Sequence, residues 1–138
     1  MEPLLRIMNK ESFFLIFVGL GVFLVSLTYG IAPNTTLSYL YDIKVNSINL
    51  SNIFRATMGL YIALVVFWMA GAKYKNLRIP ALWSLTIFMS GLALGRALSI
   101  IVDGIPYPLF IAWMIIEFVA AYLGYKLIKG LQKDYIFN

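Results

Sequence analysis

Four charged residues lie inside or at the edge of long apolar stretches, where an unpaired charge is unfavourable. Arg55, Arg96 and Glu117 lie within such stretches, and Asp103 follows the stretch that holds Arg96. An Arg or Asp near the centre of a membrane span costs about 2.5 to 3.5 kcal/mol, so such residues normally face a bundle interior and find partners. These groups could neutralise one another, or leave a guanidinium to bind a carboxylate, phosphate or sulfate.

Helical spacing predicts that these charges face neighbouring helices, because residues three, four and seven apart share a helix face. Small residues share the faces of Arg55 and Glu117, which favours close helix approach. Ser99 shares the face of Arg96. On the face of Arg55 and Glu117 the small residues are Gly59, Ala63, Ala120, Ala121 and Gly124. The candidate ligand-binding residues are Arg55, Arg96, Ser99, Asp103 and Glu117.

Two further patterns of small residues predict helix contacts. Gly19, Ser26 and Gly30 form a stripe that would turn the first apolar stretch toward the others. Gly91 and Gly95 form a G-x-x-x-G pair, which is typical of close packing between membrane helices.

The residues that the chain lacks narrow its chemistry. With no Cys and no His, it has no disulfide, thiolate, Ser-His relay or usual zinc and haem ligand, so we expect neither a metal nor another cofactor. Asp103 and Glu117 form the one carboxylate pair to consider, but they lie fourteen positions apart with no nucleophile motif nearby. We therefore expect no catalytic residues and no enzyme.

The composition places these charges in a membrane protein. The 138 residues are 62% apolar and only 12% charged, whereas soluble domains are nearer half apolar and a quarter charged. Apolar runs over 13–32, 53–72, 80–102 and 109–128 are each long enough to cross a hydrocarbon core of about 30 Å as a helix. The sequence predicts one all-α domain over 1–138, a bundle of four transmembrane helices.

The positive charges predict the orientation, because Lys and Arg favour cytoplasmic loops. Eight bases flank one side of the four spans, against Lys44 alone on the other. Both termini should therefore be cytoplasmic, and we expect a multi-pass protein of a bacterial inner membrane. The net charge of +5 fits this orientation better than nucleic-acid binding. The eight bases are Arg6, Lys10, Lys73, Lys75, Arg78, Lys126, Lys129 and Lys133.

Local signals refine the ends of the spans. The spacing over 34–42 predicts a short helix on the outer surface. Ser51 or Asn52 could cap the second span, and Pro80 suits the first turn of the third. Aromatic residues expected at the membrane boundaries are Trp68, Trp83, Tyr29, Tyr39, Tyr41 and Tyr107.

The polar and glycine pattern of the four spans resembles a known family. It resembles the bacterial membrane proteins grouped as domain of unknown function family 4345, over residues 13–128, and more loosely the DoxX-like class of four-helix proteins. The resemblance implies a four-helix bundle in a bacterial inner membrane, and supplies no activity. Its motifs are Ala32-Pro33, Arg55-Ala-Thr-Met-Gly59-Leu-Tyr61, Gly95-Arg96-Ala-Leu-Ser99, Asp103-Gly104 and Glu117.

Three functions compete. The first is a binding module, in which an outward-opening pocket holds a small anionic or amphipathic molecule, such as a lipid, on Arg55 and Arg96. The second is an accessory or scaffold subunit that docks on another membrane protein or on a second copy, with the charges purely structural. The third is proton-coupled transport through Glu117, which has less support because no inverted repeat or broken helix is evident.

Overall fold

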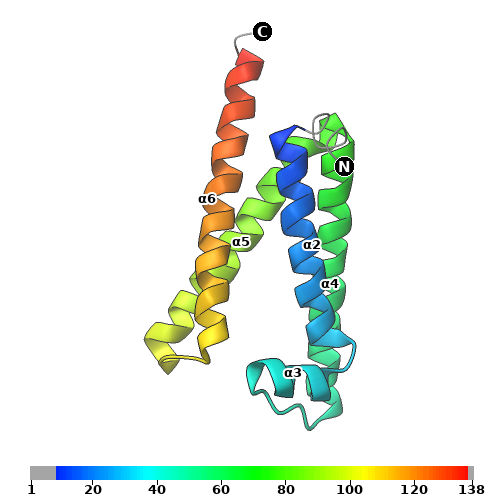
Figure 1. The fold of residues 1–138 in the computed structure, drawn as a ribbon, viewed down its shortest axis with the longest axis vertical. Helices are drawn as coiled ribbons and strands as arrows, with labels where there is room; N and C mark the ends of the chain where they lie inside the picture. The colour runs from blue at the N-terminus through cyan, green and yellow to red at the C-terminus, as the bar shows by residue number, and fades with distance from the viewer. Residues whose placement is uncertain (1–8, 137–138) are drawn as a thin grey trace.

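The computed structural model describes residues 9–136, which form five α-helices joined by short connections (Figure 1). This part of the chain contains no strand, and the predicted all-α class is confirmed. Arg6 of the orientation argument lies outside the described residues. The helices are α2 (Lys10–Gly30), α3 (Pro33–Tyr41), α4 (Ile48–Lys73), α5 (Lys75–Asp103) and α6 (Pro108–Ile136).

Four of the helices are long and apolar enough to cross a membrane: α2, α4, α5 and the Pro108–Lys133 part of α6. The chain is therefore a multi-pass membrane protein with four spans. Three of these helices extend beyond both ends of the predicted apolar runs. Helical backbone continues through the polar residues at the ends, since each added residue gains a backbone hydrogen bond.

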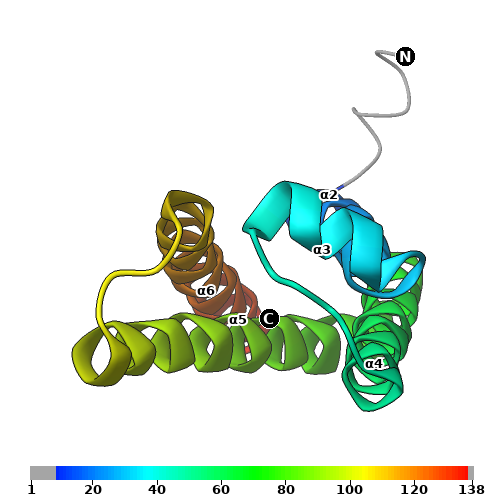
Figure 2. The same ribbon diagram turned by 90° about the horizontal axis from the view of Figure 1, so that it is seen from below.

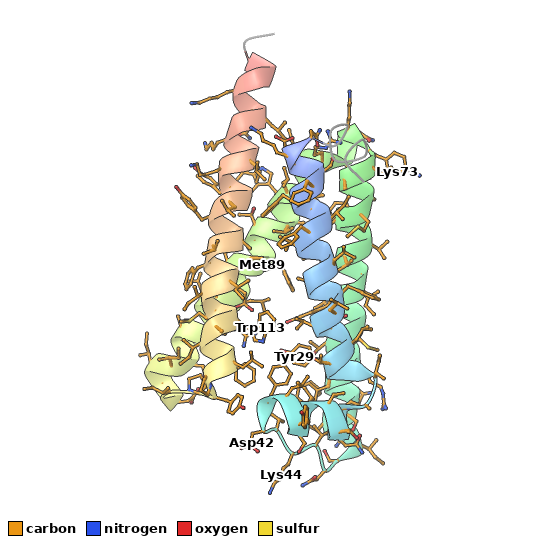
Figure 3. The ribbon with its side chains drawn as sticks, viewed as in Figure 1. Tyr29, Asp42, Lys44, Lys73, Met89 and Trp113 are labelled. Carbon is orange, nitrogen blue, oxygen red and sulfur yellow. The ribbon has the colours of Figure 1, made fainter. Side chains whose placement is uncertain are left out.

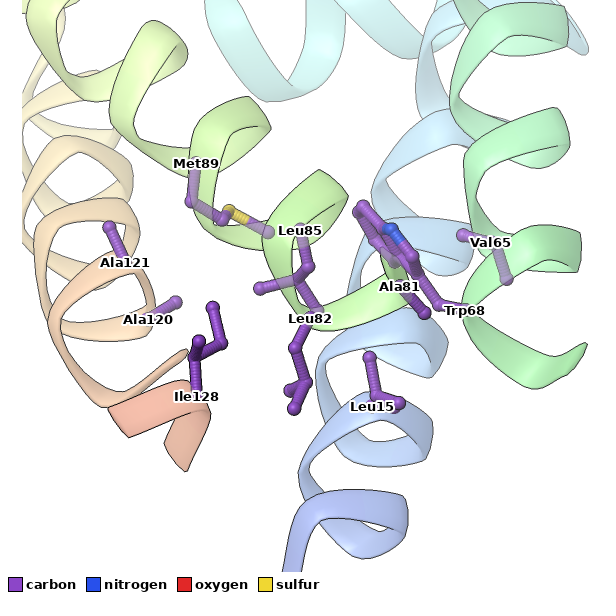
Figure 4. Close-up of a cluster of buried hydrophobic side chains, with 10 residues drawn as sticks. All are labelled: Leu15, Val65, Trp68, Ala81, Leu82, Leu85, Met89, Ala120, Ala121 and Ile128. Atoms are coloured by element: carbon purple, nitrogen blue, oxygen red, sulfur yellow. The ribbon is translucent and has the colours of Figure 1, made fainter. Parts of the chain in front are cut away.

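The four spans form two antiparallel pairs, α2 with α4 and α5 with α6. The pairs meet in an apolar cluster around Trp68, Leu15 and Leu82, whose side chains are fully buried (Figure 4). From this cluster α5 runs obliquely away from α4, so the pairs separate toward the end where α3 lies (Figure 1). We call this the α3 end of the bundle.

Small residues on α2 form its contact with α4, as the sequence indicated. Gly19 and Gly30 are buried, and a methyl group at either position would press against Met69 or Met58 of α4. Ser26, between them, is fully buried and donates its hydroxyl to the carbonyl of Phe23 within its own helix. The absence of side chains on α2 thus makes room for two methionines of α4.

The predicted inward face of α4 is wrong. Arg55, Gly59 and Ala63 are all exposed, and nothing lies within 4 Å of a Cβ built at Gly59. The buried face of α4 carries Tyr61 and Trp68 instead. Bulky side chains fit the small residues of α2, so shape complementarity decides which face is buried.

The predicted contact through Gly91 and Gly95 is also wrong. Both residues are exposed on α5, and a Cβ at either position would meet no atom within 4 Å. Where α5 does approach α4 closely, the small residues are Gly71 and Ala81, near the opposite end. The oblique course of α5 separates its glycine pair from every other helix of the chain.

The short outer helix is confirmed as α3, which reaches from the end of α2 toward α6 (Figure 2). It begins one residue earlier than predicted, with Pro33 in the first turn, where a missing N–H is tolerated. Thr36 Oγ1 donates to the Thr28 carbonyl of α2 over 2.5 Å, and Tyr41 is buried. These contacts hold α3 across the α3 end.

Two predicted helix starts are wrong. Ser47, and neither Ser51 nor Asn52, caps α4, because its extended backbone lets its hydroxyl accept from Leu50 N over 3.1 Å. Pro80 lies inside α5, which starts at Lys75 and so places this proline beyond the first turn.

The described bases divide between the two ends. Lys44 lies at the α3 end and Lys73 at the other end (Figure 3). The start of α2, the connection between α4 and α5 and the end of α6 all lie at the Lys73 end (Figure 1). This separation fits the predicted orientation, in which the Lys73 end is cytoplasmic.

Candidate functional site

The centre of the candidate site is an ion pair between α5 and α6. Arg96 donates from Nε to both carboxylate oxygens of Glu117, over 3.1 Å to Oε1 and 2.9 Å to Oε2. Only 20% of the Arg96 side chain and 9% of the Glu117 side chain are exposed. The structure thus brings together two of the five predicted site residues, a turn or more inside the spans.

The carboxylate uses only part of the guanidinium. Both hydrogen bonds come from Nε, whereas four of the five N–H bonds of an arginine are on its two Nη atoms. The Phe110 ring of α6 lies 5.4 Å from Arg96 Cζ, and the Tyr29 hydroxyl is close enough to interact with the charge. The Nη groups therefore remain able to bind a further acceptor.

Arg55 lies apart from this pair. It is exposed near the start of α4, beside Pro33 and Ser47, in a shallow depression under the loop that follows α3. The expectation that Arg55 and Arg96 converge on Glu117 is wrong. Because Arg55 is close to the end of its span, its long side chain can reach the membrane surface and needs no buried partner.

Ser99 and Asp103 form a separate exposed contact at the end of α5. The Ser99 hydroxyl donates to Asp103 Oδ2 over 2.8 Å, one helical turn apart. Within residues 9–136 the ion pairs are Lys10 with Glu11 and Arg96 with Glu117, so Asp103 closes no network. The predicted set of four inward charges is therefore reduced to one neutral pair.

A narrow apolar cavity of about 400 Å³ leads from the ion pair along α2 and α6. We call it the α2/α6 slot. Arg96, Glu117 and Trp113 lie among the residues that line it near the α3 end, and Phe17 lies at its far end. Figure 3 shows Met89, Trp113 and Tyr29 in the space between the two helix pairs. The slot therefore combines one charged region with a long apolar wall.

The rim of the slot faces the bilayer. Phe17 is 68% exposed and Leu24 64% exposed, and both line the slot on α2. Gly21, between them, is exposed, and a Cβ there would meet nothing within 4 Å. A hydrocarbon chain from the surrounding lipid could therefore enter sideways between α2 and α6.

A second cavity of about 500 Å³ lies between α4 and α5 at the α3 end. We call it the α4/α5 cavity. Its lining includes Thr57, Ser99 and the exposed glycines of α5. Arg96 and Tyr29 line both cavities. The guanidinium thus stands between an apolar slot and a more polar cavity.

An aromatic series supports this part of the molecule. Ring centroids are 5.2 Å apart between Phe110 and Tyr41, 5.8 Å between Tyr41 and Tyr29, and 5.9 Å between Tyr29 and Tyr61. Tyr29 and Tyr41 are buried in this series, and Trp68 is fully buried in the core, so their prediction as boundary residues is wrong. The sequence signal for them is the concentration of aromatic residues in the α3-end halves of the helices.

Trp113 adds an unsatisfied donor to the slot. Its Nε1 is buried and has no hydrogen-bond partner among the residues that the structure describes. A buried donor without an acceptor costs about 1 to 3 kcal/mol. An oxygen atom on a bound molecule could remove this penalty. In residues 9–136 no three His, Cys, Asp or Glu side chains gather as metal ligands would.

A family model described as Domain of unknown function (DUF4345) matches residues 11–128. The chain belongs to this family. The match extends from the first span into the fourth and includes both residues of the ion pair. No curated protein and no solved structure matches the chain. The function of this DUF4345 protein must therefore be inferred from its geometry.

Proposed function

We propose that this DUF4345 protein binds an amphipathic molecule with an acidic head group and one long apolar chain. The head group, a carboxylate or a phosphate, accepts hydrogen bonds from Arg96 Nη. The chain lies in the α2/α6 slot. The observation that carries the proposal is the use of Nε alone by Glu117, which leaves both Nη groups beside an apolar cavity.

The charge of the site favours an acceptor over a cation. The ion pair is neutral as a whole, but Arg96 and Trp113 present donors and no acceptor. Glu117 already accepts from Arg96 through both of its oxygens. A carboxylate or phosphate head group would satisfy the donors, whereas an ammonium group would meet them with the wrong polarity.

The length of the slot favours a lipid-like chain over a compact anion. Its wall on α2 extends from Phe17 to Tyr29, twelve residues, or about 18 Å at 1.5 Å per residue. A compact anion would occupy only the region of Arg96. A chain of this length also explains why the rim opens to the bilayer, from which such a molecule would come.

A substitution that fills the slot without touching the ion pair tests this proposal. Gly21→Phe places a ring in the slot, where the wild-type residue leaves open space. The matched control is Gly59→Phe, at an equally open glycine of α4 that lines neither cavity. We expect native mass spectrometry of gently extracted protein to show a bound acidic lipid in wild type and Gly59→Phe, and at least tenfold less in Gly21→Phe.

Two results would contradict the proposal. One is wild-type protein that carries no acidic amphipathic molecule after mild extraction and gains none when a long-chain fatty acid is added. The other is a Gly21→Phe variant that folds and binds as much as the wild type. Circular dichroism and gel filtration of each variant establish that the fold is retained.

The exposed small residues favour a second candidate, docking on another membrane protein. Gly91 and Gly95 on α5 and Gly59 on α4 face outward, where a foreign helix could approach closely. Lipid-phase cross-linking from these positions would then capture one defined partner. If labels appear on lipid alone, this second candidate is excluded.

A further inference from the structure

A third pocket lies at the Lys73 end, where the start of α2, the end of α4 and the start of α5 meet. It has a volume of about 350 Å³. Lys73, Lys75 and Arg78 line it, together with the polar Asn9 and Ser12. No acidic residue is in its lining, and neither ion pair within residues 9–136 involves its three bases. The pocket is therefore strongly positive.

Arg78 is held at this pocket by the backbone of α4. Its Nη2 donates to the Ala72 carbonyl over 3.2 Å, and Ser12 Oγ donates to the same oxygen over 2.7 Å. One carbonyl near the end of α4 therefore joins α2 and α5. Arg78 Nε is buried and has no acceptor in the part of the chain that the structure describes. The guanidinium is thus positioned, and one of its donors is unsatisfied.

The pocket also has an apolar side, formed by Ile16 and Met69. Ile16 lies one turn, or about 6 Å, deeper along α2 than Ser12. The bases mark one level of the pocket and the two apolar side chains the next level toward the bilayer centre. This order matches that of a phospholipid, in which a phosphate precedes the acyl chains.

We propose that this pocket binds the phosphate group of an anionic phospholipid from the adjacent leaflet, with Lys73, Lys75 and Arg78 as its cationic contacts. Ile16 and Met69 contact the upper part of an acyl chain. Basic pockets between membrane helices on the cytoplasmic side are known to bind such head groups. The site is separate from the α2/α6 slot, so it does not depend on the function proposed above.

Binding of phosphatidylglycerol to the full-length protein, followed by native mass spectrometry, tests the site. We expect wild-type protein to bind phosphatidylglycerol more tightly than phosphatidylcholine. Lys73→Gln combined with Lys75→Gln removes two of the three charges and leaves the Arg78 and Ser12 contacts in place. Each base near the surface contributes enough that the pair should weaken phosphatidylglycerol binding about 30-fold.

The matched control is Lys126→Gln combined with Lys129→Gln, which removes the same charge from α6. These lysines lie over Tyr122 and Tyr125 and outside the pocket, so this variant should bind as wild type does. The proposal is overturned if the variant at 73 and 75 keeps its affinity, or if the control loses as much.

Inorganic phosphate distinguishes a lipid from a free anion. Because it lacks the chain that contacts Ile16 and Met69, it should displace phosphatidylglycerol only at concentrations at least a hundredfold higher than a short-chain phosphatidylglycerol does. Equal competition by the two would show that the pocket binds a free anion, and the lipid assignment would be wrong.

Discussion

At the scale of single residues, the depth of a charge in its span decides whether it needs a buried partner. Arg96 and Glu117 lie far enough inside α5 and α6 that neither can readily reach water, and they pair. Arg55 lies within two turns of the start of α4 and stays exposed. The sequence could identify all three as unusual, but depth along a helix was a better guide than the small residues beside each charge.

This difference predicts the stability of three variants. Glu117→Gln leaves a buried guanidinium without its counter-charge and should lower the free energy of unfolding by about 3 kcal/mol. Replacing both partners, with Arg96→Met and Glu117→Leu, should recover most of that loss. Arg55→Gln should change it by less than about 0.5 kcal/mol. Unfolding in mixed detergent micelles measures all three.

The outcome that contradicts this account is a double variant less stable than Glu117→Gln alone. The pair would then contribute more than an apolar replacement can, and its role would be chiefly structural.

At the scale of helices, small residues showed which faces permit close approach, but not which faces use it. The prediction succeeded for α2, where Gly19 and Gly30 are filled by methionines of α4. It failed for α5, where Gly91 and Gly95 remain open. A stripe of small residues has no partner encoded in its own sequence, so the choice depends on the shape of the facing helix.

Matched alanine substitutions at two glycines test this division between helices. A methyl group at Gly71 would collide with Ala81 Cβ and approach the Leu77 carbonyl, neither of which can move aside easily. Gly71→Ala should therefore destabilise the bundle by about 1 to 3 kcal/mol. Gly91→Ala meets nothing and should be neutral or stabilising by up to about 1 kcal/mol. Thermal unfolding in the same detergent compares them, and equal losses would contradict the described packing of α4 on α5.

At the scale of the whole molecule, composition predicted the four spans, but not the separation of the two helix pairs. Leu15 is fully buried and Leu24 is 64% exposed on the same helix. Lipid tails are as apolar as leucine, so a core position and a lipid-facing position look alike in sequence. The α2/α6 slot therefore could not be predicted, although Arg96 and Glu117 at its charged region could.

Photo-cross-linking with a fatty acid that carries its reactive group at the far end of the chain tests the central claim most directly. If the carboxylate is held at Arg96 and the chain fills the slot, the label should concentrate on α2 around residues 17–21, about 18 Å from Tyr29. Gly21→Phe should abolish this label. Equal labelling of lipid-facing positions outside the slot, such as Ile87 and Leu98 of α5, would contradict the account.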